Sequence, residues 1–143
     1  MATDEDITLA VLRQRREIID QIILENKGRI FGSAGDSVIA EFDSPVKATE
    51  ASILIQNKMQ AINEALPENQ KMHFRIGLNL GDVMISGDNL YGDTINVAAR
   101  LEAKAETDGI CMSKTVFDMV SQKVKASFEV FVKISYFTSS LWR

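Results

Sequence analysis

Asn96 and Arg100 stand four residues apart inside a stretch with the spacing of an amphipathic helix. Residues at positions i and i+4 share one face of a helix, so the two side chains would project together. Arginine offers a fork of donors to phosphate oxygens, and asparagine can donate to a ribose or to an oxygen that gains charge. The pair indicates an anion-binding face. An ordinary solvated helix face explains the same pattern, so both interpretations stay open.

Asp36 is the second candidate, behind Gly32 and Gly35 in a segment with the pattern of a β-hairpin. A carboxylate at a hairpin tip is exposed, and glycine lets a phosphate or a backbone approach closely. Mg²⁺ and Mn²⁺ accept one or two protein carboxylates together with substrate phosphates, so Asp36 could ligate such a metal. An ordinary turn aspartate is the alternative. His73, the only histidine, has no partner at metal-ligand spacing and is predicted to be structural.

Helices and strands must position these side chains. Asp43, Ser44 and Pro45 indicate a capped helix start, and Ser113 caps another. In the helix that carries Asn96 and Arg100, we expect a buried side made of Val97 and Leu101, with Ala98 and Ala99 as small neighbours. The predicted helices are 4–26, 45–65, 93–105 and 114–124, and the predicted β-rich segments are 29–42, 72–87 (a strand pair or one interrupted strand), 110–113 and 127–137.

The order of these elements predicts an α+β fold, a mainly antiparallel sheet with helices packed on it. A doubly wound parallel sheet fits less well, because a direct hairpin interrupts the alternation of strands and helices.

Composition narrows the function classes. The chain has 143 residues and a net charge of −4, which argues against a nucleic acid or an anionic membrane as partner. Its single cysteine, Cys111, is predicted to be a small core residue, and such usage is typical of the cytoplasm. We expect neither a transmembrane helix nor a signal peptide. Motifs of P-loop NTPases, kinases, Rossmann dehydrogenases and serine hydrolases are absent.

Together, three segments resemble the catalytic domain of class III adenylate/guanylate cyclases, most of all the bacterial type. GRIFGSAGDSVIAEF is similar to the family's metal-binding hairpin, FRIGLNLGDV to its central strand, and NLYGDTINVAARLE to its GxxxNxAxR segment. The resemblance covers roughly Asp4 to Glu129 and implies a ferredoxin-like, palm-type nucleotidyl cyclase fold. We therefore predict a cyclase domain over residues 1–130, followed by a segment, 131–143, that is unlike the family.

The resemblance also implies chemistry. Asp36 would bind Mg²⁺ or Mn²⁺, Asn96 would contact the ribose, and Arg100 would steady the pentacovalent phosphate. Each site would take its metal carboxylates from one subunit of a homodimer and its Asn/Arg pair from the other. The implied reaction converts ATP, favoured over GTP by family frequency, to cyclic AMP and pyrophosphate.

Departures from the family pattern limit that expectation. The family carries a first metal aspartate on a strand before the first helix, and this chain begins at that helix. The purine-reading lysine falls at Gly32 and its partner acid at Asn89, so those two positions and Gly35 are the nucleotide-facing candidates. We expect impaired activity, and a sheet that lacks a central strand and is prone to strand exchange.

Two other interpretations stay open. A non-catalytic cyclase-like dimerisation or regulatory module would keep the fold without turnover. A diguanylate-cyclase-like domain would need a GG[DE]EF-type turn, which AGDSVIAEF supplies only in part.

Overall fold

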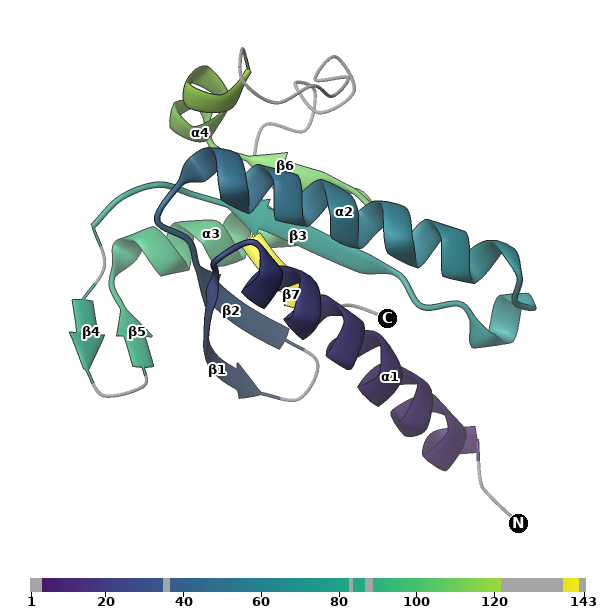
Figure 1. The fold of residues 1–143 in the computed structure, drawn as a ribbon. Helices are drawn as coiled ribbons and strands as arrows, with labels where there is room; N and C mark the ends of the chain where they lie inside the picture. Colours follow the sequence, from purple (N-terminus) through teal and green to yellow (C-terminus); the bar gives the residue numbers. More distant parts are fainter. Residues whose placement is uncertain (1–3, 35–36, 83, 87–88, 122–137, 142–143) are drawn as a thin grey trace.

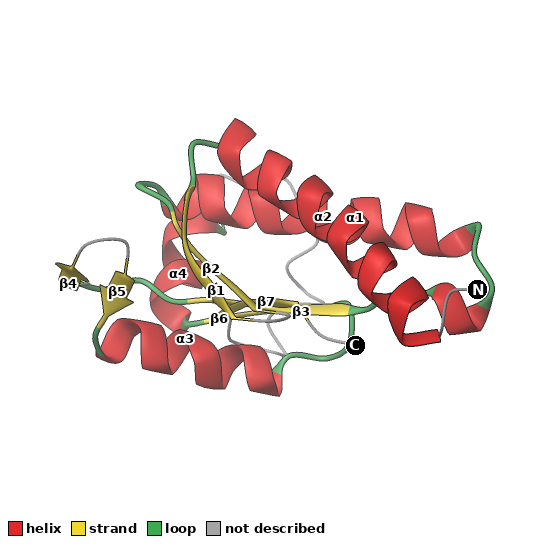
Figure 2. Cartoon of the chain, turned by 90° about the horizontal axis from the view of Figure 1, so that it is seen from below, coloured by secondary structure: helices red, strands yellow, loops and turns green. Residues whose placement is uncertain are grey.

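A computed structural model describes residues 4–34, 37–82, 84–86, 89–121 and 138–141 of the chain. Its elements form three layers (Figures 1 and 2). Helices α1 (Asp4–Glu25) and α2 (Pro45–Glu64) cover one face of a sheet, and α3 (Asp93–Lys104) covers the other. The short helix α4 (Lys114–Val120) comes directly after the strand at one edge of the sheet, and a 3-10 turn (Glu68–Gln70) comes after α2.

The main sheet has the strand order β1-β2-β7-β3-β6. Its strands are β1 (Arg29–Ala34), β2 (Ser37–Glu41), β7 (Thr138–Leu141), β3 (Phe74–Leu78) and β6 (Ile110–Met112). Neighbouring strands run antiparallel except β3 and β6, which are parallel. A separate antiparallel hairpin joins β4 (Met84–Ser86) to β5 (Asn89–Tyr91). The predicted α+β fold with a mainly antiparallel sheet is confirmed.

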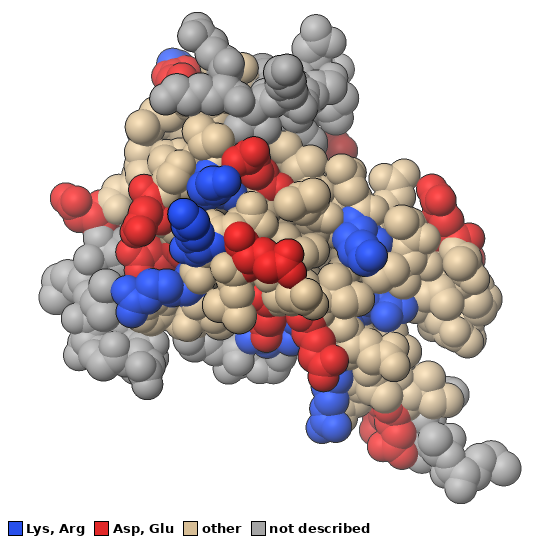
Figure 3. Space-filling view, viewed as in Figure 1, with Lys and Arg blue, Asp and Glu red and all other residues tan. Residues whose placement is uncertain are grey.

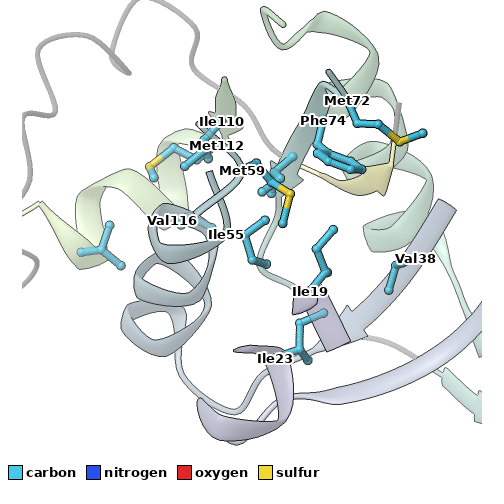
Figure 4. Close-up of a cluster of buried hydrophobic side chains, with 12 residues drawn as sticks. Ile19, Ile23, Val38, Ile55, Met59, Met72, Phe74, Ile110, Met112 and Val116 are labelled. Atoms are coloured by element: carbon cyan, nitrogen blue, oxygen red, sulfur yellow. The ribbon is translucent and has the colours of Figure 1, made fainter. Parts of the chain in front are cut away.

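The core lies between the sheet and the α1/α2 layer (Figure 4). Phe74 from β3 and Met59 from α2 are each 1% exposed, and Ile23 from α1 is 2% exposed. Cys111 is fully buried, as predicted. Aliphatic and methionine side chains at helical spacing on α1 and α2 meet alternate residues of the strands, so hydrophobic burial holds the two layers together.

Two buried amides add polar contacts to this core. Gln56 Nε2 donates to the carbonyls of Phe74, at 3.0 Å, and of Gly109, at 2.9 Å. Asn63 Nδ2 donates to the Met72 carbonyl at 2.8 Å, and its Oδ1 accepts from the Met72 backbone N–H at 3.2 Å. Both amides therefore fix the start of β3 against α2.

Two helix starts follow the predicted chemistry. Ser44 accepts from the Lys47 N–H and Ser113 from the Val116 N–H, both at 3.4 Å, so both predicted caps are present. After the end of α1, Lys27 is left-handed, with φ 65°. The next residue, Gly28, cannot carry a side chain without a shift, because a Cβ there would lie 2.7 Å from Ile23 and from Phe42.

The segment 72–87 contains two strands with an interruption between them, β3 in the main sheet and β4 in the outer hairpin, which agrees with the predicted interrupted strand. Two other strands differ from the sequence predictions. The strand β5 was not expected. The expected gap in the middle of the sheet holds β7, while the predicted β-rich ending at 127–137 lies outside the described residues.

The surface over α1 and α2 carries acidic and basic side chains side by side (Figure 3). No described helix combines the length and hydropathy needed to cross a bilayer.

Candidate functional site

Helix α3 presents Asn96 and Arg100 to solvent, and its opposite side is packed on the sheet. Leu101 is 3% exposed and Glu102 is 9% exposed, so these residues define the inner face. Ala99 is exposed and Val97 is only half-buried, so the observed buried side of α3 differs from the predicted one by about one residue around the helix axis. Among the described residues, the side chain of neither Asn96 nor Arg100 has a hydrogen bond or an ion pair. Their polar groups are available to a ligand.

The first turn of α3 is tied to the loop that follows β3. Gly92 precedes the helix with φ 127°, and no side chain caps it. Thr94 Oγ1 instead donates to the Asp82 carbonyl at 2.7 Å, and Asn79 Nδ2 donates to the Thr94 carbonyl at 3.1 Å. A Cβ on Gly81 would lie 2.5 Å from Thr94 Oγ1, so this loop can approach the helix only with glycine there. The Thr94 contacts fix the direction in which Asn96 and Arg100 project.

The hairpin β1–β2 holds the predicted metal position. Ala34 pairs with Ser37, and the two residues between them in sequence, Gly35 and Asp36, lie outside the described residues. Gly32 is in β1, where the register shifts between Phe31 and Ser33. A bulge at this place bends the strand and increases its twist.

Asn89, the other nucleotide-facing candidate, begins β5 and pairs there with Ser86. Strand β5 contacts β1, so the strands that carry Gly32 and Asn89 adjoin one another. The structure thereby brings together the two strands on which the resemblance places the positions of the family's purine-reading residues.

A cavity of about 430 Å³ lies on the inner side of α3, not at the Asn96/Arg100 face. Ala98, Ala99 and Glu102 line it from α3, and Ile39 and Glu41 line it from β2. Asn96 and Arg100 do not line it. The predicted Asn/Arg pair therefore lies outside this cavity, and the two residues are presented outward.

Two carboxylate residues that the sequence did not indicate, Glu41 and Glu102, line this cavity. Glu102 is buried, and Glu41 has a buried Oε2 with no hydrogen-bond partner among the residues that the structure describes. Burial of Glu102 follows from its place one turn after Ala98 on the inner face of α3, a signal that the sequence does contain. The exposure pattern of Glu41 depends on which strand lies beside β2, so no local signal reveals it.

Among residues whose placement is described, no group of three or more His, Cys, Asp and Glu side chains could hold a metal ion. His73 Nδ1 lies 2.8 Å from Asp108 Oδ2 on the surface, and the pair links the start of β3 to the turn before β6. Asp82 contributes its backbone carbonyl to the Thr94 contact.

Comparison with known proteins gives consistent results. The family model for the adenylate and guanylate cyclase catalytic domain matches residues 5–136. A Rhizobium meliloti (strain 1021) protein named "Putative adenylate cyclase 3" is 37% identical over 129 residues, 90% of this chain and 22% of that protein. An adenylate cyclase of Streptomyces coelicolor is 29% identical over 89 residues, 62% of this chain and 22% of that protein.

A solved structure extends the similarity to the fold. The crystal structure of an adenylate/guanylate cyclase/hydrolase from Silicibacter pomeroyi superposes with a TM-score of 0.75 at 37% sequence identity. The superposition covers 79% of this chain and 67% of the other. By contrast, this chain spans only about a fifth of the curated relatives named above.

Proposed function

The chain belongs to the adenylate and guanylate cyclase catalytic domain family, and we propose that it forms cyclic AMP from ATP at a site shared between two copies. ATP is proposed over GTP because two similar proteins carry the name adenylate cyclase. The domain boundary at residue 130 and the cofactor, Mg²⁺ or Mn²⁺ at Asp36, stay predictions.

The outward presentation of Asn96 and Arg100 carries this proposal. Both side chains are exposed, lack partners among the described residues, and project from a helix whose first turn is fixed by Thr94. Exposed polar side chains without partners on a rigid helix are suited to bind a ligand that is held by a second copy of the chain. The family resemblance implies that each Asn/Arg pair would meet the metal-binding hairpin, β1–β2, of the other copy.

The reaction assigns one task to each side chain. The ribose 3′-oxygen attacks the α-phosphorus, the bond to the pyrophosphate oxygen breaks, and cyclic AMP and pyrophosphate leave. The Asn96 amide would hold the ribose so that the 3′-oxygen lies in line with that bond. The Arg100 guanidinium would donate to the oxygens on which negative charge accumulates in the transition state.

A divalent metal would supply charge neutralisation at the triphosphate and a more acidic 3′-hydroxyl. The described carboxylates do not form a cluster that fits such an ion, so no further step is assigned to it. Because the sequence matches one of the family's two metal aspartates, we expect low turnover from this chain alone.

The test is cyclic nucleotide production by the purified chain with Mn²⁺ and either ATP or GTP. Arg100→Ala should reduce product at least about 100-fold, as expected for loss of a transition-state donor. Lys58→Ala removes a positive charge from the exposed side of α2, on the other face of the sheet, and should leave product within about twofold. Equal product from Arg100→Ala and the parent chain would refute the assigned role.

Self-association separates the enzyme from a non-catalytic module. Sedimentation should show a concentration-dependent dimer for the parent chain. Two results together would favour the module. The parent chain would make no cyclic nucleotide under any condition, and replacing both Asn96 and Arg100 would leave dimerisation unchanged.

A further inference from the structure

The start of helix α3 is fastened to the loop that leaves β3. Thr94 Oγ1, in the first turn of the helix, donates to the carbonyl of Asp82 at 2.7 Å. Asn79, directly after β3, donates from Nδ2 to the carbonyl of Thr94 at 3.1 Å. Thr94 therefore takes part through its side chain and through its backbone, so a rotation or a slide of the helix start would break at least one of the two bonds.

Helix α3 lacks the kind of cap that begins α2 and α4. Serine hydroxyls cap those two helices, whereas the N-cap residue of α3 is Gly92, which has no side chain. A side-chain cap satisfies an amide of its own helix. The bonds of Thr94 and Asn79 instead join the helix to the loop after β3, so their effect is to place α3 on the sheet.

The bond from Thr94 to Asp82 also closes the base of the outer hairpin. Asp82 lies shortly before β4 and Gly92 directly after β5, where the chain leaves the hairpin and enters α3 (Figure 1). The hairpin carries Asn89, which the resemblance places near the base, and α3 carries the Asn/Arg pair. This bond therefore joins the segment expected to face the base to the helix expected to face the ribose and the phosphate.

Gly81 leaves the room that the Thr94 hydroxyl needs. A Cβ at position 81 would lie 2.5 Å from Thr94 Oγ1 and 3.3 Å from Thr94 Cγ2. The φ of Gly81 is not in the left-handed region, so glycine is needed here for space and not for backbone conformation. The loop and the threonine thus fit each other closely at the point where the hydrogen bond forms.

The far end of α3 has its own attachment. Arg75 Nη1 donates to the carbonyl of Ala103 at 3.3 Å, so a helix released at its start would pivot about this end. Asn96 lies seven residues from Ala103, about 10 Å along the helix axis, and a tilt of about 6° would move it by about 1 Å. Misplacement of a catalytic group by about 1 Å can cost about 100-fold in rate. Arg100 is nearer the pivot and would move less.

We propose that Thr94 and Asn79 are positioning residues of the cyclase site, which hold the start of α3 so that Asn96 keeps the ribose in line for attack. Neither residue touches the nucleotide, and both act through Asn96 and, to a smaller extent, through Arg100. The expected effect on turnover rests on the proposed function, whereas the effect on the position of α3 does not.

Thr94→Val and Thr94→Ser form a matched pair, because valine keeps the shape of threonine without the hydroxyl and serine keeps the hydroxyl. With Mn²⁺ and ATP, Thr94→Val should lower kcat at least about tenfold and change KM less than about threefold, since the misplacement acts in the transition state. Thr94→Ser should keep kcat within about threefold of the parent chain. Thr115→Val, at an exposed threonine of α4, is the control and should stay within about twofold.

Gly81→Ala tests the same contact from the loop side. The new methyl group would push Thr94 Oγ1 away from the Asp82 carbonyl, so kcat should fall at least about fivefold. In a Thr94→Ala background only the Cβ remains, 3.5 Å from the new methyl group, which is an ordinary contact. There Gly81→Ala should change kcat less than about twofold, because the two substitutions remove one and the same bond.

A distance measurement makes the test independent of turnover. Nitroxide labels on Asn96→Cys in α3 and Asn57→Cys in α2 report the spread of positions of the helix start by pulsed electron spin resonance. Cys111 is fully buried and stays unlabelled in the native chain, and dilution with unlabelled chain suppresses distances between copies. Thr94→Val should broaden the distance distribution, and Thr94→Ser should leave it unchanged.

Two results would overturn the proposal. One is equal width of the distance distributions for Thr94→Val and Thr94→Ser, whether both are narrow or both are broad. The other is an active parent chain in which Thr94→Val keeps kcat within about twofold. A parent chain that makes no cyclic nucleotide, while Thr94→Val alone broadens the distribution, would refute the proposed reaction and support the positioning role.

Discussion

The amide of Asn63 determines how the chain enters β3, and its replacement by leucine gives a sharp test of the fold. Asn63 is 8% exposed and bonds both the N–H and the carbonyl of Met72, as a neighbouring strand would. Met72 is 5% exposed, so water cannot replace the amide. Leucine has a similar size but leaves both backbone groups of Met72 without a partner.

The expected cost follows from those two groups. Each buried and unsatisfied backbone group costs about 1–3 kcal/mol, so the pair should cost about 3–4 kcal/mol after the apolar gain from leucine. A domain of this size loses about 3 °C in Tm for each kcal/mol. We therefore expect Asn63→Leu to lower the Tm by about 10 °C.

Thermal unfolding by circular dichroism and urea unfolding measure this loss. Asn57→Leu is the matched control, because Asn57 is an exposed amide on the same helix and should change stability by less than about 0.5 kcal/mol. If Asn63→Leu and Asn57→Leu unfold within about 1 kcal/mol of each other, the two Met72 contacts do not carry the proposed energy.

Three further outcomes follow from single contacts. Gly28→Ala should cost about 1–3 kcal/mol in urea unfolding, because the new Cβ would lie 2.7 Å from the Phe42 ring; an unchanged midpoint would refute the close approach. The thiol of Cys111 should react with a disulfide reagent only as fast as the chain unfolds, and immediate reaction of the native chain would contradict its full burial. The ammonium of Lys71, 2.8 Å from Glu68, holds the pKa of that carboxyl below its ordinary value. Its contribution is present above the ordinary pKa and is lost as the pH falls through the lowered one, so Lys71→Met should raise the Glu68 pKa in an NMR titration, and no change would be the contrary result.

Local signals predicted the helices well. Ser44 before Pro45, and Ser113 before a helical pattern, cap helices in the structure because a hydroxyl at that place satisfies an amide that the helix leaves free. The exposed i, i+4 pair Asn96 and Arg100 was also predicted correctly, since helical geometry alone fixes which residues share a face.

Strand partners could not be predicted in the same way. Strand β5 has three residues and no alternating pattern, so its pairing with β4 depends on the turn between them. Strand β7 has the sequence Thr-Ser-Ser-Leu, which by itself resembles a loop. Its strand conformation comes from the free positions of β2 and β3, residues that lie far away in sequence.

The candidate site was predicted by residue type, and its geometry was not. Asn96 and Arg100 lie as expected, yet the face of α3 behind them borders a cavity with Glu41 and Glu102, which no short motif marks. Such a cavity arises where four elements meet, so a pattern confined to one element does not reveal it.

Helix α3 links the cavity to the Asn/Arg pair. Its inner face, with Ala98 and Glu102, lines the cavity, and its outer face carries Asn96 and Arg100. Because the 12 residues of α3 form one hydrogen-bonded helix, a change in the packing of its inner face would shift the outer pair as well. Catalytic groups misplaced by about 1 Å can lose about 100-fold in rate. A substitution that alters the packing of the cavity would therefore lower turnover through the position of α3, even though neither Asn96 nor Arg100 lines the cavity.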